Sequence, residues 1–400
     1  MKKKPLLITA GIVFVLLVAL VWIYLFFYGT PDSSNDVYSN LGFEINNQPT
    51  TVTTPPAQNL DQDFNPGPTT AIDTNTTTNP LQQLTSRPVA GFLIIDTASS
   101  TVARYVERGT GFVYDINLST GVETQVSQTT VPRVAEATFN SDGSTLTMTS
   151  YTGYELTVFA GSLTDTSFSY INLEPGAHSI AFSNSDNLLY AISNGGTTRG
   201  YSHNLDTASR REVFTFDFVN TDVFWGEGYD NIYLSTRPGG SLPGYVYTIS
   251  ETTVTPVLPA LQNLHAVITP EHTIATFGNR ESVSSVAIAT DGEQHELPIT
   301  AIPSKCVATP LDTAGLWCAA PISIDSIAYL GDWNKGTVQS DDFIWYVDID
   351  RETASLRANP DRLRGRSLDI DKLNIDTKGR YLLMRDRTDQ TLWLLDTDNI

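Results

Sequence analysis

One short pattern recurs along most of this chain: an apolar residue that ends a strand, a polar turn, and a second apolar run. The first apolar residue stands at positions 139, 182, 225 and 268, which are 43 residues apart three times in succession. The pattern also occurs at 95, 307 and 375, which makes seven units. A period of about 40 to 45 residues with room for four strands predicts a seven-bladed β-propeller. The seven residues are Ile95, Phe139, Phe182, Trp225, Ile268, Val307 and Ile375.

The stretch from 81 to 400 carries no extended apolar pattern of helical period. It contains short alternating or β-branched runs, such as residues 111–118, separated by Gly, Asn and Asp turns. Runs of this kind are typical of strands. The expected fold class is therefore all-β, with the propeller occupying residues 81–400.

The turns after these apolar residues resemble the Ser-x-Asp-Gly hairpin of WD-repeat-like and Tol-type periplasmic propellers. One copy is Ser141-Asp142-Gly143, which follows Phe139-Asn140. The resemblance extends over most of 88–400 as a degenerate repeat, and it implies the propeller fold.

The last unit is too short for four strands, because only 25 residues follow Ile375. We expect residues 81–87 to supply the missing outer strand, so that pairing of the N- and C-terminal strands closes the ring. Closure would remove an edge strand with unpaired backbone groups. The sixth interval is 68 residues long, which predicts an insertion within residues 322–342.

The sequence has two cysteines, Cys306 and Cys318, placed symmetrically about position 312. In a hairpin folded at that point they face each other across two strands, at a Cα separation that a disulfide can bridge. We expect a structural disulfide. A metal site or a redox pair is the alternative, but there is no CxxC spacing and no nearby His.

Residues 6–28 form a run of 23 residues without a charge, and Lys2, Lys3 and Lys4 precede it. A helix of this length reaches about 34 Å, enough to cross a bilayer. The lysines are expected to keep residues 1–5 in the cytoplasm, with residues 6–28 in the membrane and residues 29–400 outside. A cleaved signal peptide is the alternative, but its apolar region would be shorter and a small-x-small site would follow. We expect a single-pass cell-membrane protein with an extracytoplasmic domain.

Residues 29–80 are rich in Thr, Asn, Pro and Gln and contain no Lys or Arg. A segment of this composition buries too little apolar surface to offset the entropy of ordering. It is interpreted as a disordered linker between the membrane and the propeller.

The net charge of −20 argues against general nucleic-acid binding. Basic residues nevertheless gather near the C-terminus, where Arg362, Arg364 and Arg366 form one run. The run is interpreted either as a patch for an anionic polymer or lipid headgroup, or as arginines paired with nearby aspartates. The aspartates are Asp361, Asp369, Asp371, Asp376, Asp386 and Asp389.

Candidate contact residues lie in the predicted insertion, where an exposed Trp on a loop is a common anchor for partners. They are Tyr329, Asp332, Trp333 and Lys335. The alternative for Trp333 is that it packs back onto its own blade. A further candidate is Arg237, in a loop rich in Gly and Ser.

Catalytic motifs are absent from the sequence, since there is no Gly-x-Ser-x-Gly elbow, His-Glu-x-x-His or phosphate-binding glycine loop. His178 and His265 each precede a strand end by a few residues. They either converge on a central site or are packed strand histidines. Acidic pairs at 348–352 and 369–371 do not match a calcium loop, so no metal or cofactor is expected.

The sequence thus favours a membrane-tethered binding or scaffold module for an envelope protein or glycan. The alternative is an extracytoplasmic hydrolase or lyase with its site in the axial channel, because propeller enzymes can build sites from dispersed residues.

Overall fold

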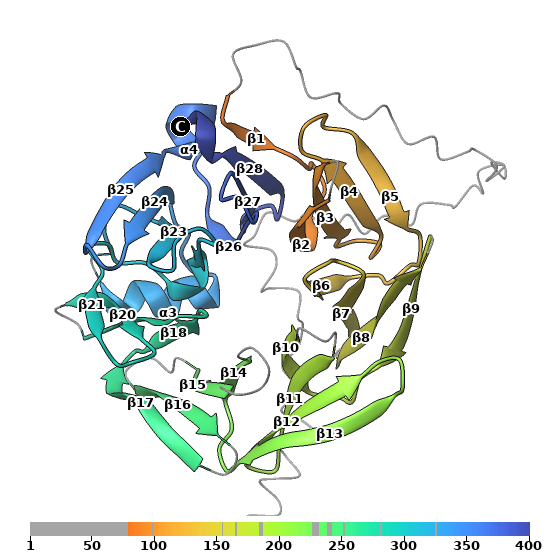
Figure 1. Cartoon of the computed structure of the whole chain (residues 1–400), viewed down its shortest axis with the longest axis horizontal. Helices are drawn as coiled ribbons and strands as arrows, with labels where there is room; N and C mark the ends of the chain where they lie inside the picture. The colour runs from red at the N-terminus through yellow and green to blue at the C-terminus, as the bar shows by residue number, and fades with distance from the viewer. Residues whose placement is uncertain are drawn as a thin grey trace, which may run out of the picture. The chain divides into compact units, whose positions relative to one another are not determined.

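The computed structural model describes residues 79–400 except 98–99, 154, 165, 184–186, 226–231, 238–241, 251–252, 280–281 and 325. In this part of the chain, seven four-stranded sheets are arranged around a central axis (Figure 1). The predicted all-β, seven-bladed propeller is confirmed. The expected cytoplasmic tail, membrane span and linker fall on residues 1–78, outside the described residues. Among the residues described, no helix is both long and apolar enough to span a membrane.

Each blade is an antiparallel sheet; in blades 1 to 6 four consecutive strands pair in order from the axis outward, and in blade 7 the outer strand is β1 (Figure 1). Blade 1 contains β2 (Val89–Asp96), β3 (Thr101–Glu107), β4 (Val113–Asn117) and β5 (Glu123–Ser127). Blade 2 contains β6 (Val134–Phe139), β7 (Thr145–Thr152), β8 (Glu155–Thr164) and β9 (Ser167–Asn172). Blade 3 contains β10 (Ala177–Phe182), β11 (Leu188–Asn194), β12 (Thr197–Asn204) and β13 (Ser209–Phe216). Blade 4 contains β14 (Thr221–Trp225), β15 (Ile232–Thr236), β16 (Pro243–Ser250) and β17 (Thr253–Gln262).

The remaining three blades include the two departures from the simple repeat. Blade 5 contains β18 (His265–Ile268), β19 (His272–Gly278), β20 (Val283–Ala289) and β21 (Gln294–Glu296). Blade 6 contains β22 (Cys306–Ala308), β23 (Gly315–Ala320), β24 (Phe343–Asp348) and β25 (Thr353–Ala358). Blade 7 contains β26 (Ile370–Ile375), β27 (Tyr381–Asp386), β28 (Leu392–Asp396) and β1 (Leu81–Gln83). The 3₁₀ turns are η2 (Pro303–Lys305) and η3 (Thr397–Asn399).

The seven residues that defined the sequence repeat all lie in the innermost strand of a blade. Five of them are the last residue of that strand, as Phe139 is in β6 and Ile268 in β18. The repeat therefore marks the point where each inner strand turns back into its neighbour. Because the inner strands surround the axis, their residues provide the walls of any central site.

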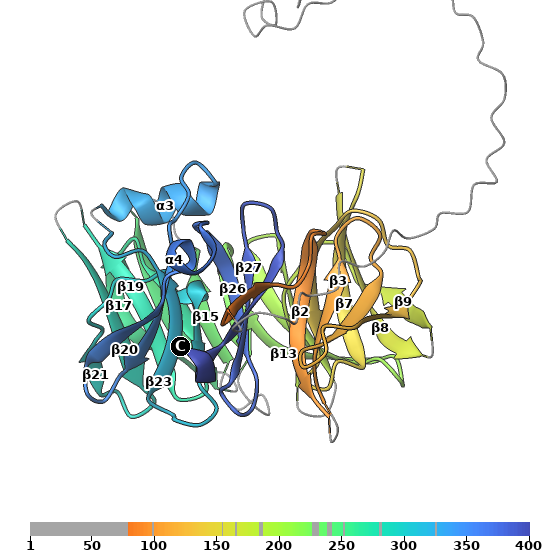
Figure 2. The ribbon, with the colours of Figure 1, turned by 90° about the horizontal axis from the view of Figure 1, so that it is seen from above.

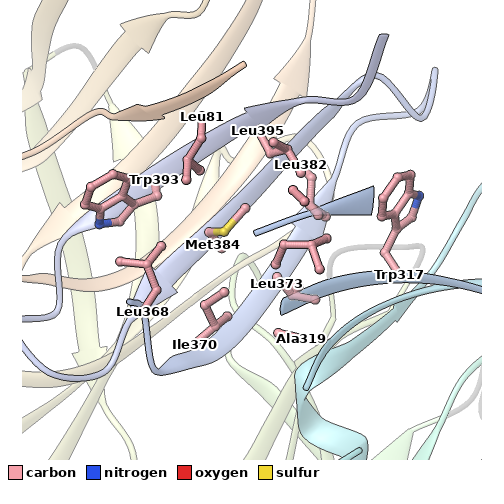
Figure 3. Close-up of a cluster of buried hydrophobic side chains, with 12 residues drawn as sticks. Leu81, Trp317, Ala319, Leu368, Ile370, Leu373, Leu382, Met384, Trp393 and Leu395 are labelled. Carbon is pink, nitrogen blue, oxygen red and sulfur yellow. The ribbon is translucent and has the colours of Figure 1, made fainter. Parts of the chain in front are cut away.

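Blade 7 is completed by the N-terminal strand, as expected from the short last unit. Leu81, Gln82 and Gln83 of β1 pair with Leu395, Leu394 and Trp393 of β28. Leu81 is fully buried, and Figure 3 shows it among Trp393, Leu395 and Met384. The pairing uses three residues, so the strand is shorter than the expected donor, 81–87.

The predicted disulfide is confirmed. Cys306 and Cys318 are directly opposed in the β22–β23 ladder, and the Cα atoms of the bonded pair are 4.1 Å apart. The bond joins the two inner strands of blade 6, beside the insertion.

The insertion connects β23 to β24 and contains α3 (Ile327–Lys335), which lies on one face of the ring of blades (Figure 2). The helix begins at Ser326, whose hydroxyl accepts a hydrogen bond from the Ala328 N–H group at 3.2 Å. It ends at Gly336, which has a φ of 77° that glycine adopts without strain. The position of the insertion was predicted, but its helix was not. A second helix, α4 (Pro360–Arg364), precedes β26.

The β1 strand offers a direct test of ring closure. Leu81→Ala removes a fully buried side chain and should lower the free energy of unfolding by about 2–5 kcal/mol. Gln83→Ala changes an exposed residue of the same strand and should change it by less than about 0.5 kcal/mol. Urea denaturation of the two variants measures the difference, and equal effects would contradict the role of Leu81 in closing the ring.

Candidate functional site

A cavity of about 1030 Å³ lies against the inner strands of blades 2 to 5 and against residues 302–304 and Asn334 near blade 6. We call it the axial cavity. Its wall follows β18 from His265 at the start of the strand to Glu271 beyond its end. It therefore extends along the whole length of an inner strand.

Hydroxyl groups dominate the polar part of the axial cavity, and aromatic side chains accompany them. The hydroxyl-bearing residues include Thr138, Thr147, Thr149, Ser179, Ser235 and Ser304. The aromatic residues are Phe224, Trp225 and Tyr233. Such a lining can hydrogen-bond a polyhydroxylated ligand and stack against its apolar faces.

The wall formed by blade 2 has hydrogen-bonding capacity that the fold does not use. Thr138 pairs with Thr147, and Glu136 with Thr149, across β6 and β7, so all four side chains share one face of the sheet. Thr147 lines the cavity, and no hydrogen bond joins its hydroxyl to another described residue. The residue is only 2% exposed, but its hydroxyl is not among the fully buried polar atoms that lack a partner, so it is open to water or to a ligand in the cavity. This face is therefore suited to receive polar groups of a ligand.

His178 lies on β10 and lines the cavity. Each of its ring nitrogens is hydrogen-bonded to a serine hydroxyl. Nδ1 is 3.0 Å from the Ser179 hydroxyl oxygen, and Nε2 is 3.0 Å from the Ser193 hydroxyl oxygen. Burial lowers the pKa of His178, and the positive charge of Arg237 lowers it further, whereas Asp222 opposes the shift. The ring is therefore neutral at pH 7.

His265 begins β18 and is 7% exposed. Burial lowers the pKa of its ring to about 4. The Nδ1 atom lies 3.4 Å from the side-chain amide nitrogen of Asn334, the residue that follows Trp333 on α3. The structure thus brings His178 and His265 to the same cavity, each packed within its own strand.

Arg237, a candidate contact residue, lies at the end of β15 and lines the axial cavity. Its Nε atom donates to a carboxylate oxygen of Asp222 at 2.8 Å, and about half of its side chain is exposed. The guanidinium is therefore held in place while part of it stays accessible.

Trp333 is not an exposed anchor, so that interpretation is wrong and the alternative, packing against the propeller, holds. The side chain is 6% exposed, and its Nε1 group donates to a carboxylate oxygen of Asp369 at 2.7 Å. The Lys305 ammonium and the Arg387 guanidinium each lie 4.4 Å from the centre of its ring. The indole therefore fixes α3 to blade 7.

Beneath α3 lies a buried ionic network that no local sequence signal revealed. The Lys305 ammonium donates to Asp342 at 2.7 Å and to Asp369 at 3.2 Å, and all three residues are buried. Burial raises the pKa of Asp342, although Lys305 acts in the opposite direction. The network joins the η2 turn, the end of the insertion and the start of β26, so it holds the cavity rim in place.

The other insertion candidates do not form one site with Trp333. Tyr329 is half-buried beside Leu330 and Ile302, and burial raises the pKa of its phenol. Asp332 and Lys335 form an exposed ion pair at 3.3 Å on the outer side of the helix. None of these three lines the axial cavity; of the insertion, Asn334 does.

The three arginines of the C-terminal run have different environments. Arg366 binds Asp389 at 2.7 Å and also Asp386, as the pairing interpretation expected. Arg364 donates to the backbone carbonyl of Leu81 and so supports the closing strand β1. Arg362 is exposed.

Solved structures of several β-propellers are similar to this chain. Oligogalacturonate lyase from Vibrio parahaemolyticus has a TM-score of 0.55 at 9% identity, over 79% of this chain and 93% of that one. Hydrazine synthase of Kuenenia stuttgartiensis has a TM-score of 0.53 at 13% identity, over 78% of this chain and 96% of that one. A third similar structure is the propeller domain of the trilobed protease from Pyrococcus furiosus, which is described as having an open velcro topology. Its TM-score is 0.50 at 9% identity, over 77% of this chain and 95% of that one.

These likenesses show the fold alone. No family model and no curated protein matches the sequence, so the resemblance to WD-repeat-like and Tol-type propellers extends only to the propeller architecture. Within the described residues, no group of three or more His, Cys, Asp or Glu side chains is placed to hold a metal ion.

The ionic network yields a prediction about stability. Lys305→Met leaves Asp342 and Asp369 buried without their cation, and should lower the free energy of unfolding by about 3–5 kcal/mol. Lys335→Met removes a lysine from an exposed pair and should change it by less than about 0.5 kcal/mol. Equal losses in chemical denaturation would show that the buried lysine has no special role.

The lowered pKa of His265 yields a prediction about pH. The unfolded chain binds the histidine proton near pH 6.5, whereas the folded chain binds it only near pH 4, so stability is complete above pH 6.5 and falls toward pH 4. The loss from this group is on the order of 3 kcal/mol. His265→Gln should remove that part of the pH dependence in denaturation curves at pH 7, 5.5 and 4. An unchanged dependence would exclude His265 as its source.

Proposed function

We propose that this chain is a membrane-tethered extracytoplasmic binding module whose axial cavity takes an uncharged, polyhydroxylated ligand of the glycan class. The observation that carries the proposal is the blade 2 wall, where Thr138, Thr147 and Thr149 offer hydroxyl groups that form no hydrogen bond with another residue of the described part of the chain. Aromatic rings on β14 and β15 provide stacking surfaces in the same cavity.

Charge supports an uncharged ligand over a polyanion. The chain has a net charge of −20, and its cavity wall includes Glu136 and Glu271. The cavity arginine, Arg237, is already paired with Asp222. A polyuronate or other polyanion would approach a surface of the same sign, which slows association and weakens binding.

The uncharged segment 6–28 and its flanking lysines support an anchor with the propeller outside the cell membrane. The disulfide between Cys306 and Cys318 agrees with an oxidising compartment. In that location the ligand is a glycan of the cell envelope, and an envelope protein is the other candidate partner.

An enzyme acting in the axial cavity is the second candidate function. The favouring observation is His178, a neutral imidazole in contact with a serine hydroxyl on the cavity wall. The same fold carries a lyase in the Vibrio parahaemolyticus structure, but the likeness extends to the fold alone.

Calorimetric titration of the full chain in detergent with neutral and uronate oligosaccharides tests the binding function. We expect neutral oligosaccharides to bind and uronates to bind more weakly. Thr147→Val removes one hydroxyl from the cavity wall at nearly constant volume and should weaken binding about 3- to 10-fold. Thr152→Val, on the same strand but outside the cavity, is the matched control. Absence of neutral binding, or stronger binding of uronates, would contradict the proposal.

A further inference from the structure

A chain of hydrogen bonds with a fixed direction passes through His178. The Thr198 hydroxyl donates to the backbone carbonyl of Phe218 at 2.7 Å, so its proton is not available to Ser193. Ser193 must therefore donate to Thr198, across 2.9 Å, and its oxygen is left to accept from His178 Nε2. The proton of the neutral ring is thus on Nε2, which leaves Nδ1 as an acceptor for Ser179.

The Ser179 hydroxyl completes this chain. Its oxygen accepts a hydrogen bond from the Val223 N–H group at 2.9 Å, and its own proton is directed to His178 Nδ1. A serine whose hydroxyl donates to a neutral imidazole has the arrangement of a nucleophile beside its general base. Ser193 orients the imidazole from the other side, as the third member of a triad does.

The backbone also holds Ser179 in an unusual conformation. Its φ of 51° is one that residues other than glycine rarely adopt, and the ladder between β10 and β11 shifts register between His178 and Ala181. The carbonyl of Ser179 accepts from the Trp225 Nε1 group at 2.6 Å, which ties this strained residue to β14. Strain of this kind costs about 1–3 kcal/mol and is concentrated at functional sites. Here it accompanies a hydroxyl on the wall of the axial cavity.

We infer that Ser179 is a nucleophile and His178 its general base, in a site that cleaves carboxylic esters carried by a polyhydroxylated ligand. Ser193 positions the imidazole. Arg237 lines the same cavity; its Nε atom is paired with Asp222, but about half of its side chain is exposed, and this part can face the developing oxyanion. The inference goes beyond ligand binding, because it assigns a reaction to the same cavity.

The reaction has two steps. The Ser179 oxygen attacks the ester carbonyl carbon while its proton passes to His178 Nδ1; the bond to the alcohol oxygen then breaks, and that proton passes to the departing alkoxide. Water then attacks the acyl-serine, giving a proton to His178 and displacing the serine oxygen, which takes the proton back. The products are an alcohol and a carboxylic acid.

The third member of this triad is a hydroxyl, so it orients the imidazole without adding negative charge. The carboxylate that acts on His178 is Asp222, which favours the protonated ring and is itself held by Arg237. Because Arg237 disfavours the protonated ring, which forms in both the acylation and the deacylation step, we expect slow turnover.

The test is covalent labelling of the full chain in detergent with a fluorophosphonate, which loses fluoride as it forms a phosphonyl-serine. We expect one adduct by intact mass, located on Ser179 by peptide mapping, and slow hydrolysis of p-nitrophenyl acetate. Absence of an adduct on Ser179 after exhaustive incubation would overturn the inference. An equal adduct in Ser179→Ala would also overturn it.

Variants separate chemistry from folding. Ser179→Gly removes the hydroxyl and suits the positive φ, so it should fold and lose labelling even if Ser179→Ala does not fold. His178→Gln should slow labelling at least 10-fold. Arg237→Gln should lower kcat for ester hydrolysis and change KM much less. Ser169→Ala, on the outer strand β9, should label like the parent chain. Normal labelling in folded His178→Gln would exclude His178 as the base.

Glycan binding measured by calorimetry does not depend on labelling of Ser179. Failure of the binding proposal can therefore be distinguished from failure of the esterase proposal.

Discussion

The ring of blades depends on one short strand pairing, between Leu81–Gln83 of β1 and Trp393–Leu395 of β28. Without it, blade 7 would end in an exposed edge strand. Blade 7 also packs against blade 1 through a shared apolar cluster and through the hydrogen bond from the Ile94 N–H group to the Asn374 side chain at 2.9 Å. The backbone hydrogen bonds of only three paired residues contribute little to the stability of the β1–β28 pairing. It is stabilised instead by the burial of Leu81 in the blade 7 core and by Arg364, which bonds the Leu81 carbonyl. Every inner strand keeps its position around the axial cavity because this ring is closed.

Much of the architecture could be predicted because a propeller repeats the same arrangement of strands and turns in every blade. The apolar residue that ends each inner strand must recur once per blade, so the 43-residue interval from Phe139 to Ile268 reports blade size directly. The shortened last unit was informative because it departs from this interval. The two cysteines were informative because they lie symmetrically about one turn, which places them opposite each other on paired strands. These are properties of neighbouring strands, which sequence patterns record well.

The site was less predictable because its contacts join residues from different blades. Nothing local marks Lys305 as buried, since its two carboxylates lie 37 and 64 residues further along the chain. Trp333 was ambiguous for a similar reason: its environment consists of Lys305 and Arg387, which belong to other segments. His178 and Ser179 are adjacent in sequence, but the register shift and the contact with Val223 that orient them become visible only in the folded chain.

The position of β1 in the chain has a mechanical meaning. β1 is the first strand of the described residues, so tension applied along the chain at Asn79 reaches this strand first. A load applied there would meet the hydrogen bond from the Asn79 side chain to the Leu363 carbonyl at 2.6 Å, then the three ladder residues, the Leu81 side chain and the Arg364 contact. The strand that closes the ring is thus the first strand of the described chain to bear such tension. A pull strong enough to extract β1 would expose the edge of β28, while the apolar cluster shared by blades 1 and 7 and the hydrogen-bonded hairpins of all blades would remain in place.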